Sequence, residues 1–313
     1  MKKPVKILLF VLAGLAVIVL VIVIFISTAK IPVYEVDFPE LSVEVTPERV
    51  AEGERIASVI CMQCHASPDG KLGGAYMADA QDFGEIYASN ITRHPDFGIT
   101  EYTDGELAYL IRCGVDREGK YIPPWMPKFP LLSDQDLYSV IAFLKSDHPM
   151  VQPSDLEQPE PVPSFFAKFL LRTGLEPLPY PEEPVIAPPE SDRVAFGRYL
   201  AVGKFDCYSC HSASFAKMDP MQPENSKGYF GGGNVLYDKE MNQVISSNLT
   251  MDEETGIGSW TEEEFVMALR FGRKPDGTTV QPPMAPAPRI TDEEASAIWA
   301  YLQIIPVIRN EIE

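Results

Sequence analysis

The pentapeptide Cys61-Met62-Gln63-Cys64-His65 constrains this chain more than any other stretch, and it recurs as Cys207-Tyr208-Ser209-Cys210-His211. C-x-x-C-H is the pattern at which a c-type haem is attached to protein. Its two thiols, about one helical turn apart, bond to the porphyrin, and the following histidine lies beneath the iron as proximal ligand. The sequence therefore predicts two covalently bound haem c groups, one on Cys61, Cys64 and His65 and one on Cys207, Cys210 and His211.

Two other uses of a C-x-x-C pair fit the sequence less well. A redox-active pair is typical of a βαβ setting and has no obligatory histidine, and no such setting is visible here. A zinc site would need its second cysteine pair far closer than the 146 residues that separate Cys61 from Cys207. The haem interpretation is therefore favoured.

Residues 7–27 form an uncharged apolar run that is long enough, at about 21 residues, to cross a bilayer as a helix. Three lysines precede the run and only Lys30 follows closely, so the positive-inside rule places the N-terminus in the cytoplasm. The alternative is a cleaved signal peptide ending near Ala29, but secretory apolar segments usually span about 7–15 residues. We expect residues 1–30 to be a single-pass anchor in a bacterial cytoplasmic membrane, with everything beyond them on the periplasmic side.

The remainder of the chain contains one block of sequence twice. The tripeptide 90–92 (NIT) matches 248–250 (NLT) at an offset of 158, and this register continues for more than fifty residues. The same offset pairs Tyr102 with Trp260, Arg112 with Arg270, Gly114 with Gly272, Met126 with Met284 and Leu144 with Leu302. Such a register indicates an internal duplication.

Each block is predicted to be helical. Capping boxes, in which a Ser or Thr is followed three residues later by an acid, open two helices per block, at Thr103, Ser133, Thr261 and Thr291. A third helix leads into each C-x-x-C-H motif. We therefore expect an all-α fold of two tandem domains, each with three main helices around one haem, behind one transmembrane helix.

The domain limits follow from these patterns. We expect an extended polar tether at 31–46, the first haem domain at 47–146, a linker at 147–190 and the second haem domain at 191–313. The linker holds eleven prolines between Pro149 and Pro189 and is predicted to be stiff and extended. Its apolar stretch 164–172 (SFFAKFLLR) fits a membrane surface, although packing against the haem domains is favoured. The second domain is 12 residues longer between its haem motif and its Asn-x-Thr tripeptide, in an insert expected to include Gly231-Gly232-Gly233.

The sixth ligands of the two irons are predicted to be methionines. The chain has four histidines, and the two outside the haem motifs, His94 and His148, both belong to the first block. Met284 is the one methionine of the second block with a partner in register, Met126, and both stand in proline-bounded loops that can hold a thioether rigidly. The alternative for any single methionine is core packing. His94 is expected at the surface, His148 exposed at the start of the linker, and Cys113 as a small buried apolar residue.

Asn90 and Asn248 fit the glycosylation pattern, but their recurrence at equivalent positions indicates a structural role. We expect both to hydrogen-bond the backbone near a haem propionate, with Arg112 and Arg270 as charge partners of the propionates.

The two blocks resemble class I cytochrome c domains. Residues 247–261 (SNLTMDEETGIGSWT) in particular resemble the haem subunits of membrane-bound bacterial alcohol and gluconate dehydrogenases and related diheme cytochromes. In the first block Phe97, Thr100 and Tyr102 replace the Thr, Gly and Trp of this pattern. The resemblance implies ligation by His65 with Met126 and by His211 with Met284, and a role as electron carrier.

The expected function is therefore that of a membrane-anchored diheme c-type cytochrome. It would relay single electrons from a quinol- or substrate-oxidising partner to a terminal oxidase or a soluble carrier, without a catalytic residue of its own. The alternatives are a diheme peroxidase, which needs one iron with an openable site, and a non-catalytic cytochrome subunit of a larger respiratory complex. The net charge of −19 argues against nucleic acid, which requires basic stripes, and favours basic protein partners.

Overall fold

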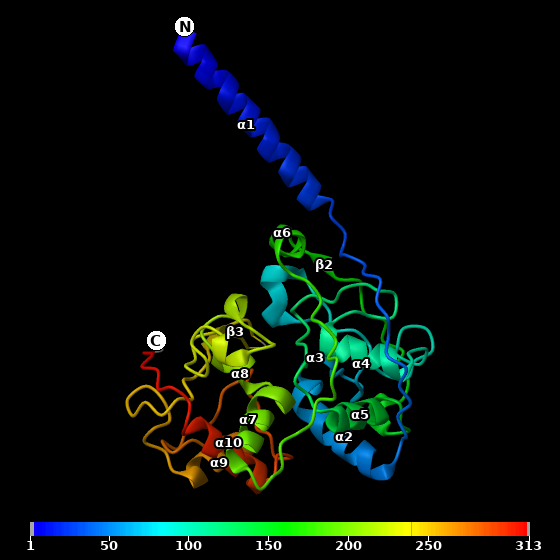
Figure 1. Ribbon diagram of the computed structural model, residues 1–313, viewed down its shortest axis with the longest axis vertical. Coiled ribbons are helices and arrows are strands. Elements are labelled where there is room, and N and C mark those ends of the chain that lie inside the picture. Colours follow the sequence, from blue (N-terminus) through cyan, green and yellow to red (C-terminus); the bar gives the residue numbers. More distant parts are fainter. Residues whose placement is uncertain (1–2, 239, 312–313) are drawn as a thin grey trace.

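The computed structural model describes residues 3–238 and 240–311, so the predicted outer limits at residues 1 and 313 lie outside the described residues. The structure is mostly helical (Figure 1). Helix α1 (Lys3–Ser27) projects from a compact helical body. It has 25 residues and contains an 18-residue stretch with a mean hydropathy of 3.6, so it is long and apolar enough to cross a membrane. By these two properties alone α1 is either an anchor or a signal sequence.

The first half of the body is built on α2 (Pro47–Ile60), the short α3 (Met62–His65), α4 (Asp104–Cys113) and α5 (Asp134–Leu144). Helices α2 and α5 pack so closely at Gly53 that a Cβ atom there would collide with the carbonyl oxygen of Ser139. The hydrophobic core between the helices includes Ile56, Leu107, Leu137, Ile141 and Phe143.

The second half repeats this arrangement with α7 (Arg193–Arg198), its π-helical continuation η3 (Tyr199–Lys204), α8 (Cys207–His211), α9 (Glu262–Phe271) and α10 (Asp292–Leu302). Here a Cβ atom at Gly197 would collide with the carbonyl oxygen of Ala297, the counterpart of Ser139. The core of this half includes Leu200, Phe230, Phe265, Ile298 and Leu302.

Shorter elements connect these helices. In the part of the chain that the structure describes, they are two antiparallel pairs of strands and several 3-10 helices. Their bounds are η1 (Ala78–Phe83), β1 (Gly84–Glu85), η2 (Pro149–Val151), β2 (Val162–Pro163), η4 (Phe215–Lys217), η5 (Pro223–Asn225), β3 (Val235–Tyr237) and β4 (Gln243–Ile245). Strand β1 pairs with β2, which attaches the linker to the first half, and β3 pairs with β4.

The predicted caps are present, with one difference. Full capping boxes open α4, α9 and α10 at Thr103, Thr261 and Thr291. At α5 the Ser133 hydroxyl accepts from the backbone N–H of Asp136, but the Asp136 carboxylate does not return to the cap. That carboxylate instead accepts a hydrogen bond from the Tyr199 hydroxyl of the second half.

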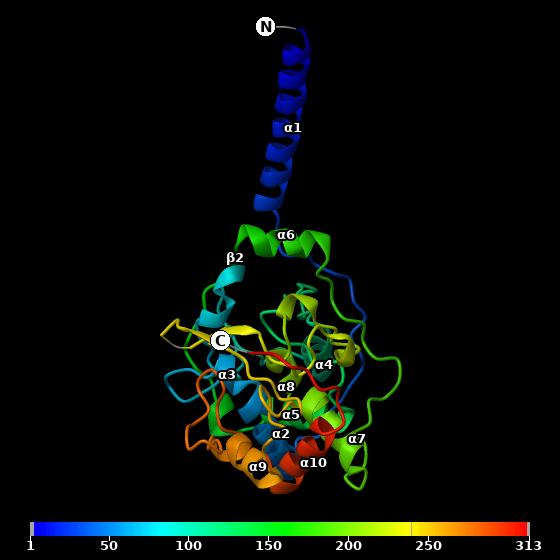
Figure 2. The same cartoon turned by 90° about the vertical axis from the view of Figure 1, so that its left-hand side faces the viewer.

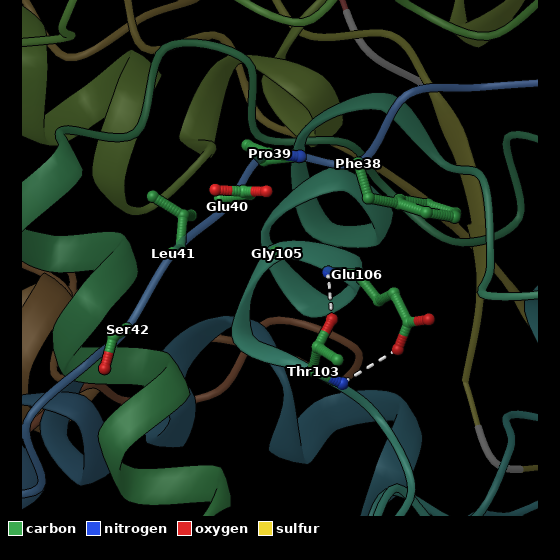
Figure 3. A pocket seen from close by; sticks show the side chains of 8 residues that line it. All are labelled: Phe38, Pro39, Glu40, Leu41, Ser42, Thr103, Gly105 and Glu106. Carbon is green, nitrogen blue, oxygen red and sulfur yellow. Dashed lines mark hydrogen bonds between the residues drawn. The ribbon is translucent and has the colours of Figure 1, made fainter.

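The segment 31–46, predicted as a tether, is packed along the first half. The backbone N–H of Tyr34 donates to the carbonyl oxygen of Gly119 (2.7 Å), and that of Val43 donates to the Asp104 carboxylate (2.7 Å). Residues 38–42 cross the start of α4 beside the Thr103–Glu106 capping box and border an open cavity of about 460 Å³ there (Figure 3). The segment that joins α1 to the body is therefore held against the first half by hydrogen bonds.

The duplication is also visible in the hydrogen bonds around the haem motifs. The backbone N–H of Gly74 donates to the carbonyl oxygen of His65 (2.9 Å), and that of Gly232 donates to the carbonyl oxygen of His211 (2.8 Å). Ile91 N–H donates to Leu72 O, and Leu249 N–H donates to Phe230 O. The extra residues of the second half therefore lie within 212–229, opposite 66–71, and the expectation that the insert includes residues 231–233 is wrong.

The two halves meet through related contacts across a pseudo-twofold axis. Arg55 of α2 bonds the Glu294 carboxylate at the start of α10 (2.5 Å), while Tyr199, in the position equivalent to Arg55, bonds Asp136 at the start of α5. Such reciprocal contacts are those of a twofold interface. At its centre lies the buried Lys204, 2.7 Å from Glu52 and within 4 Å of the Asp136 and Glu294 carboxylates.

Candidate haem sites

A cavity of about 780 Å³ in the first half gathers the residues that the sequence singled out there: Cys61, Cys64, His65, Asn90 and Met126 all line it. The volume lies in the range of about 300–1,000 Å³ that is usual for cofactor pockets. The remaining wall is largely apolar and includes Ile99, Leu107, Ile111, Phe129, Leu132, Val140 and Leu144. Residues from α2, α3, α4, α5 and the loop 123–127 thus converge on one space.

His65 is oriented by the backbone of the same wall. Its Nδ1 lies 2.7 Å from the carbonyl oxygen of Ser89, and a carbonyl can only accept, so Nδ1 carries the proton. The Nε2 atom of the neutral ring is then free to bind a metal, and this contact through the other nitrogen fixes the ring. Burial lowers the pKa of His65, which also favours the neutral ring.

The second half orients its histidine in the same way. The Nδ1 atom of His211 lies 2.9 Å from the carbonyl oxygen of Ser247, which stands 158 residues after Ser89. Met284 is more open than Met126, with 36% of its surface exposed, and Phe271 beside the C-terminus of α9 is 48% exposed. The candidate haem residues of the second half are therefore more exposed to solvent than those of the first half.

The Met126 loop is held by a residue that sequence reasoning missed. The Lys128 ammonium donates to the carbonyl oxygens of Pro123 (2.8 Å) and Met126 (2.5 Å), and so closes the loop onto itself. Trp125 turns into an apolar cluster with Met77, Ile86 and Ala167. In the second half Pro286 stands in place of Lys128, so no pattern shared by the two copies indicates the role of Lys128.

Known proteins resemble this chain in the same regions. Residues 50–147 match the family model described as cytochrome c. This part of the chain is a cytochrome c domain. Such a domain implies covalently bound haem c, and the residues of the 780 Å³ cavity fit it, since two thiols, a neutral imidazole and a thioether share one apolar wall.

Three relatives cover most of the chain. An alcohol dehydrogenase (quinone) cytochrome c subunit of Gluconacetobacter polyoxogenes is 26% identical over 79% of this chain and 54% of its own length. A gluconate 2-dehydrogenase cytochrome c subunit of Pantoea cypripedii is 27% identical over 81% of this chain and 59% of its own. A diheme cytochrome c-type protein of Cereibacter sphaeroides is 27% identical over 86% and 90%. The chain thus spans little more than half the length of the dehydrogenase subunits that it matches.

Asn90, at the edge of the cytochrome c domain's cavity, ties the linker to that domain. Its amide donates to the carbonyl oxygens of Ser154 and Leu156 (both 2.9 Å), and its side-chain oxygen accepts from Thr92. Asn248 donates in the same manner to Ile308 O (2.7 Å) and accepts from Thr250. Both asparagines are buried, so each Asn-x-Thr tripeptide fastens the chain that follows the last helix of its half.

Arg112 and Arg270 each bond the end of one helix to the start of the next, α4 to α5 and α9 to α10. Arg112 is 1% exposed and its Nη2 donates to the Asp134 carboxylate (2.6 Å) and to Leu132 O (2.7 Å), while Arg270 bonds Asp292 and Pro288 O. Arg112 is not among the residues that line the described cavity. In both arginines Nε is buried without a hydrogen-bond partner in the described parts of the chain, and the expected propionate contact stays a prediction.

Three further expectations have different outcomes. Cys113 is fully buried, as predicted. His94 is not a surface residue: it is 8% exposed, because its ring stacks on Phe97 at 3.8 Å and its Nδ1 accepts from the backbone N–H of Asp96. His148 is half-buried rather than exposed, since its ring packs near Phe143 and accepts from the N–H of Met150.

Proposed function

We propose that this chain is a membrane-anchored diheme c-type cytochrome that passes single electrons between redox partners. The observation that carries the proposal is the pairing of each C-x-x-C-H histidine with a backbone carbonyl, His65 with Ser89 and His211 with Ser247. This contact leaves Nε2 of each histidine free for iron. Haem c supplies one-electron oxidation and reduction, and the protein sets its potential through ligand choice and burial.

The second half is, on this proposal, a second cytochrome c domain with the limits predicted from the sequence. Its glycine contact between α7 and α10, its histidine contact and its Asn-x-Thr anchor all repeat those of the first domain. Gly197, His211 and Asn248 stand 144, 146 and 158 residues after their counterparts. The diheme relative from Cereibacter sphaeroides, which the chain matches over 90% of its length, supports two haem groups.

Met126 and Met284 complete the proposed coordination opposite His65 and His211. Met126 lies on the wall of the same cavity as His65, and the Lys128 contacts hold its loop in place. With a thioether opposite imidazole, both haem groups would have raised potentials. Neither iron would then keep a position open for a substrate.

Transfer between the two haem groups is part of the proposed relay. Val59, two residues before Cys61, packs against the core of the second half, and Cys207 packs against that same core. The attachment point of the first haem therefore borders the contact between the halves. The Lys204 cluster and the reciprocal bonds of Arg55 and Tyr199 keep this arrangement rigid.

The partners are proposed from the relatives and from charge. Relatives named as cytochrome c subunits of alcohol and gluconate dehydrogenases support a quinol- or substrate-oxidising complex as partner. The net charge of −19 favours a basic surface on a protein that docks transiently, such as a soluble carrier or an oxidase. Helix α1, retained as an anchor, would hold the body at the periplasmic face of the membrane.

A redox titration of the detergent-solubilised full chain, followed by absorption spectroscopy and combined with haem quantification, tests this function. We expect two haem groups per chain, both low-spin at positive potentials and both inert to carbon monoxide. The open setting of Met284 is the one observation that favours the alternative diheme peroxidase. One high-spin haem that binds carbon monoxide and reacts with peroxide would establish that alternative instead.

A further inference from the structure

Helix α6 (Phe165–Thr173) of the linker presents two opposite faces. Ala167 and Leu171 are 1% and 6% exposed, and Ala167 packs into the apolar cluster beneath it. On the other face Phe165, Phe166 and Phe169 are 47%, 51% and 41% exposed. A nine-residue helix that turns three phenylalanines outward needs an apolar medium on that side.

The same helix is fastened to the end of α1. The Lys168 ammonium donates to the carbonyl oxygen of Ser27 (2.8 Å), and Arg172 reaches the carbonyl oxygen of Lys30 and lies 5.8 Å from the ring centre of Phe25. Among the described residues of α1, Ile26 in its last turn is the buried one. Figure 2 shows α6 lying across the lower end of α1.

This contact determines the depth of α6 if α1 crosses a membrane. A bilayer core about 30 Å thick takes up about 20 helical residues, so the last turn of the 25-residue α1 reaches the headgroup region. Because α6 is bonded to that turn, it lies at the same level. Its phenylalanines would then meet lipid, as the apolar face of an interfacial helix does.

The charges around α6 suit the same position. Lys30, Lys168 and Arg172 surround the end of α1, in a chain whose net charge is −19. Neither Lys168 nor Arg172 forms an ion pair with any residue that the structure describes, so both remain available to lipid phosphates. Cations beside a membrane are attracted to anionic headgroups.

We propose that α6 is an interfacial helix that lies in the headgroup layer of the phospholipid bilayer beside α1. This inference rests on the proposed retention of α1 as an anchor. With α1 spanning the bilayer and α6 lying on it, the body is held at two points and cannot turn about the axis of α1. The cluster under α6 includes Trp125 and contacts Cys64, so the first haem site is coupled directly to this membrane contact.

Photocrosslinking of the full chain in lipid nanodiscs tests the proposal. The discs contain a phospholipid with a photoactivatable group near its headgroup, and adducts are mapped by peptide mass spectrometry. We expect adducts on residues 165–173 and on α1, and none on the peptide of Phe271, the last residue of α9. This phenylalanine is equally exposed, but α9 lies at the end of the body away from α1 (Figure 2). Labelling of α1 without labelling of α6 would overturn this inference alone.

A variant with Phe165→Ser, Phe166→Ser and Phe169→Ser extends the test. We expect labelling of α6 to fall to the level of the Phe271 peptide while labelling of α1 persists, with the haem spectrum unchanged as evidence of correct folding. Undiminished labelling of α6 in this variant would contradict the role given to the three phenylalanines. If the intact mass of the purified protein corresponds to a chain that begins near residue 30, α1 has been cleaved. That result would overturn the anchor proposal and this inference with it.

Discussion

At the scale of single residues, Met126 and Met284 occupy equivalent sequence positions but different surroundings. Lys128 closes the Met126 loop through two carbonyl oxygens, whereas Met284 is 36% exposed and has a proline in place of that lysine. A thioether held less firmly is displaced more readily by an external ligand. We therefore expect the two proposed haem groups to differ in how firmly methionine is held as the sixth ligand of the iron.

Replacing each methionine separately tests this assignment. In Met126→Ala or Met284→Ala we expect one haem of the two to become high-spin, to bind carbon monoxide and to fall in potential, because the thioether that raises the potential is lost. Absorption spectra and redox titration of the full chain measure all three changes. Met221→Ala, at an exposed methionine without a counterpart in register, is the control. Unchanged spectra in Met284→Ala would refute its role as ligand.

Cys113 provides a second prediction at this scale. Its side chain is fully buried at the end of α4, and burial raises the pKa of its thiol to about 12. Because the thiolate is the reactive form, Cys113 should not react with iodoacetamide at pH 8 in the folded protein and should react after denaturation. Peptide mass spectrometry before and after unfolding provides the measurement. Rapid alkylation of the native chain would contradict the burial of this thiol.

At the scale of elements, the Asn-x-Thr tripeptides connect parts of the chain that are distant in sequence. Asn90 holds the linker at residues 154 and 156, and Asn248 holds the C-terminal stretch at residue 308. The distant groups that each side chain holds at these points are backbone carbonyl oxygens. A loss of either side chain therefore loosens a segment rather than a helix.

Asn248→Ala is expected to lower the free energy of unfolding by about 1–3 kcal/mol, since it leaves the buried N–H of Thr250 without its partner and removes one of the two side-chain hydrogen bonds to the carbonyl oxygen of Ile308. Chemical denaturation of the full chain in detergent measures the change. Asn242→Ala, at an exposed asparagine of the same half, should change stability by no more than about 0.5 kcal/mol. Equal effects of the two substitutions would argue against the fastening role.

At the scale of the whole molecule, one buried cation organises the contact between the halves. The Lys204 ammonium, 6% exposed, lies among Glu52, Asp136 and Glu294, of which Glu52 and Glu294 also bind Arg55. These residues come from α2, α5, η3 and α10. The relative placement of the two proposed haem sites therefore depends on a cluster that belongs to neither half alone.

Lys204→Met should lower the free energy of unfolding by about 3–5 kcal/mol, because it leaves the partly desolvated Asp136 carboxylate without a cationic partner and leaves Glu52 and Glu294 to share Arg55 alone. Denaturation curves of the variant, read from each haem's spectrum, also show whether the two halves still unfold together. Lys217→Met, at an exposed lysine of the second half, is the matched control. A Lys204 variant as stable as this control would mean that the cluster does not hold the halves together.

Features that depend on neighbouring residues could be predicted from the sequence. The C-x-x-C-H motifs, the Asn-x-Thr repeats and three of the four capping boxes involve residues no more than a few positions apart, so their spacing alone carries the information. The register of 158 residues predicted that the two halves share helices and contacts. The apolar run of α1 was recognisable for the same reason, because a spanning helix needs only length and composition.

Long-range packing was decided by the tertiary structure. The packed course of residues 31–46 and the contact of α6 with α1 join residues that are far apart in the sequence, which no local pattern encodes. The burial of His94 and the role of Lys128 rest on contacts within five residues, but no recognised motif indicates them. The polar character of 31–46 predicted an extended tether, and only the structure shows that its backbone is hydrogen-bonded to the first half. Sequence patterns indicated which groups would bind haem, whereas only the folded chain determined how the two halves and helix α1 are held, because contact energy depends on distance in space.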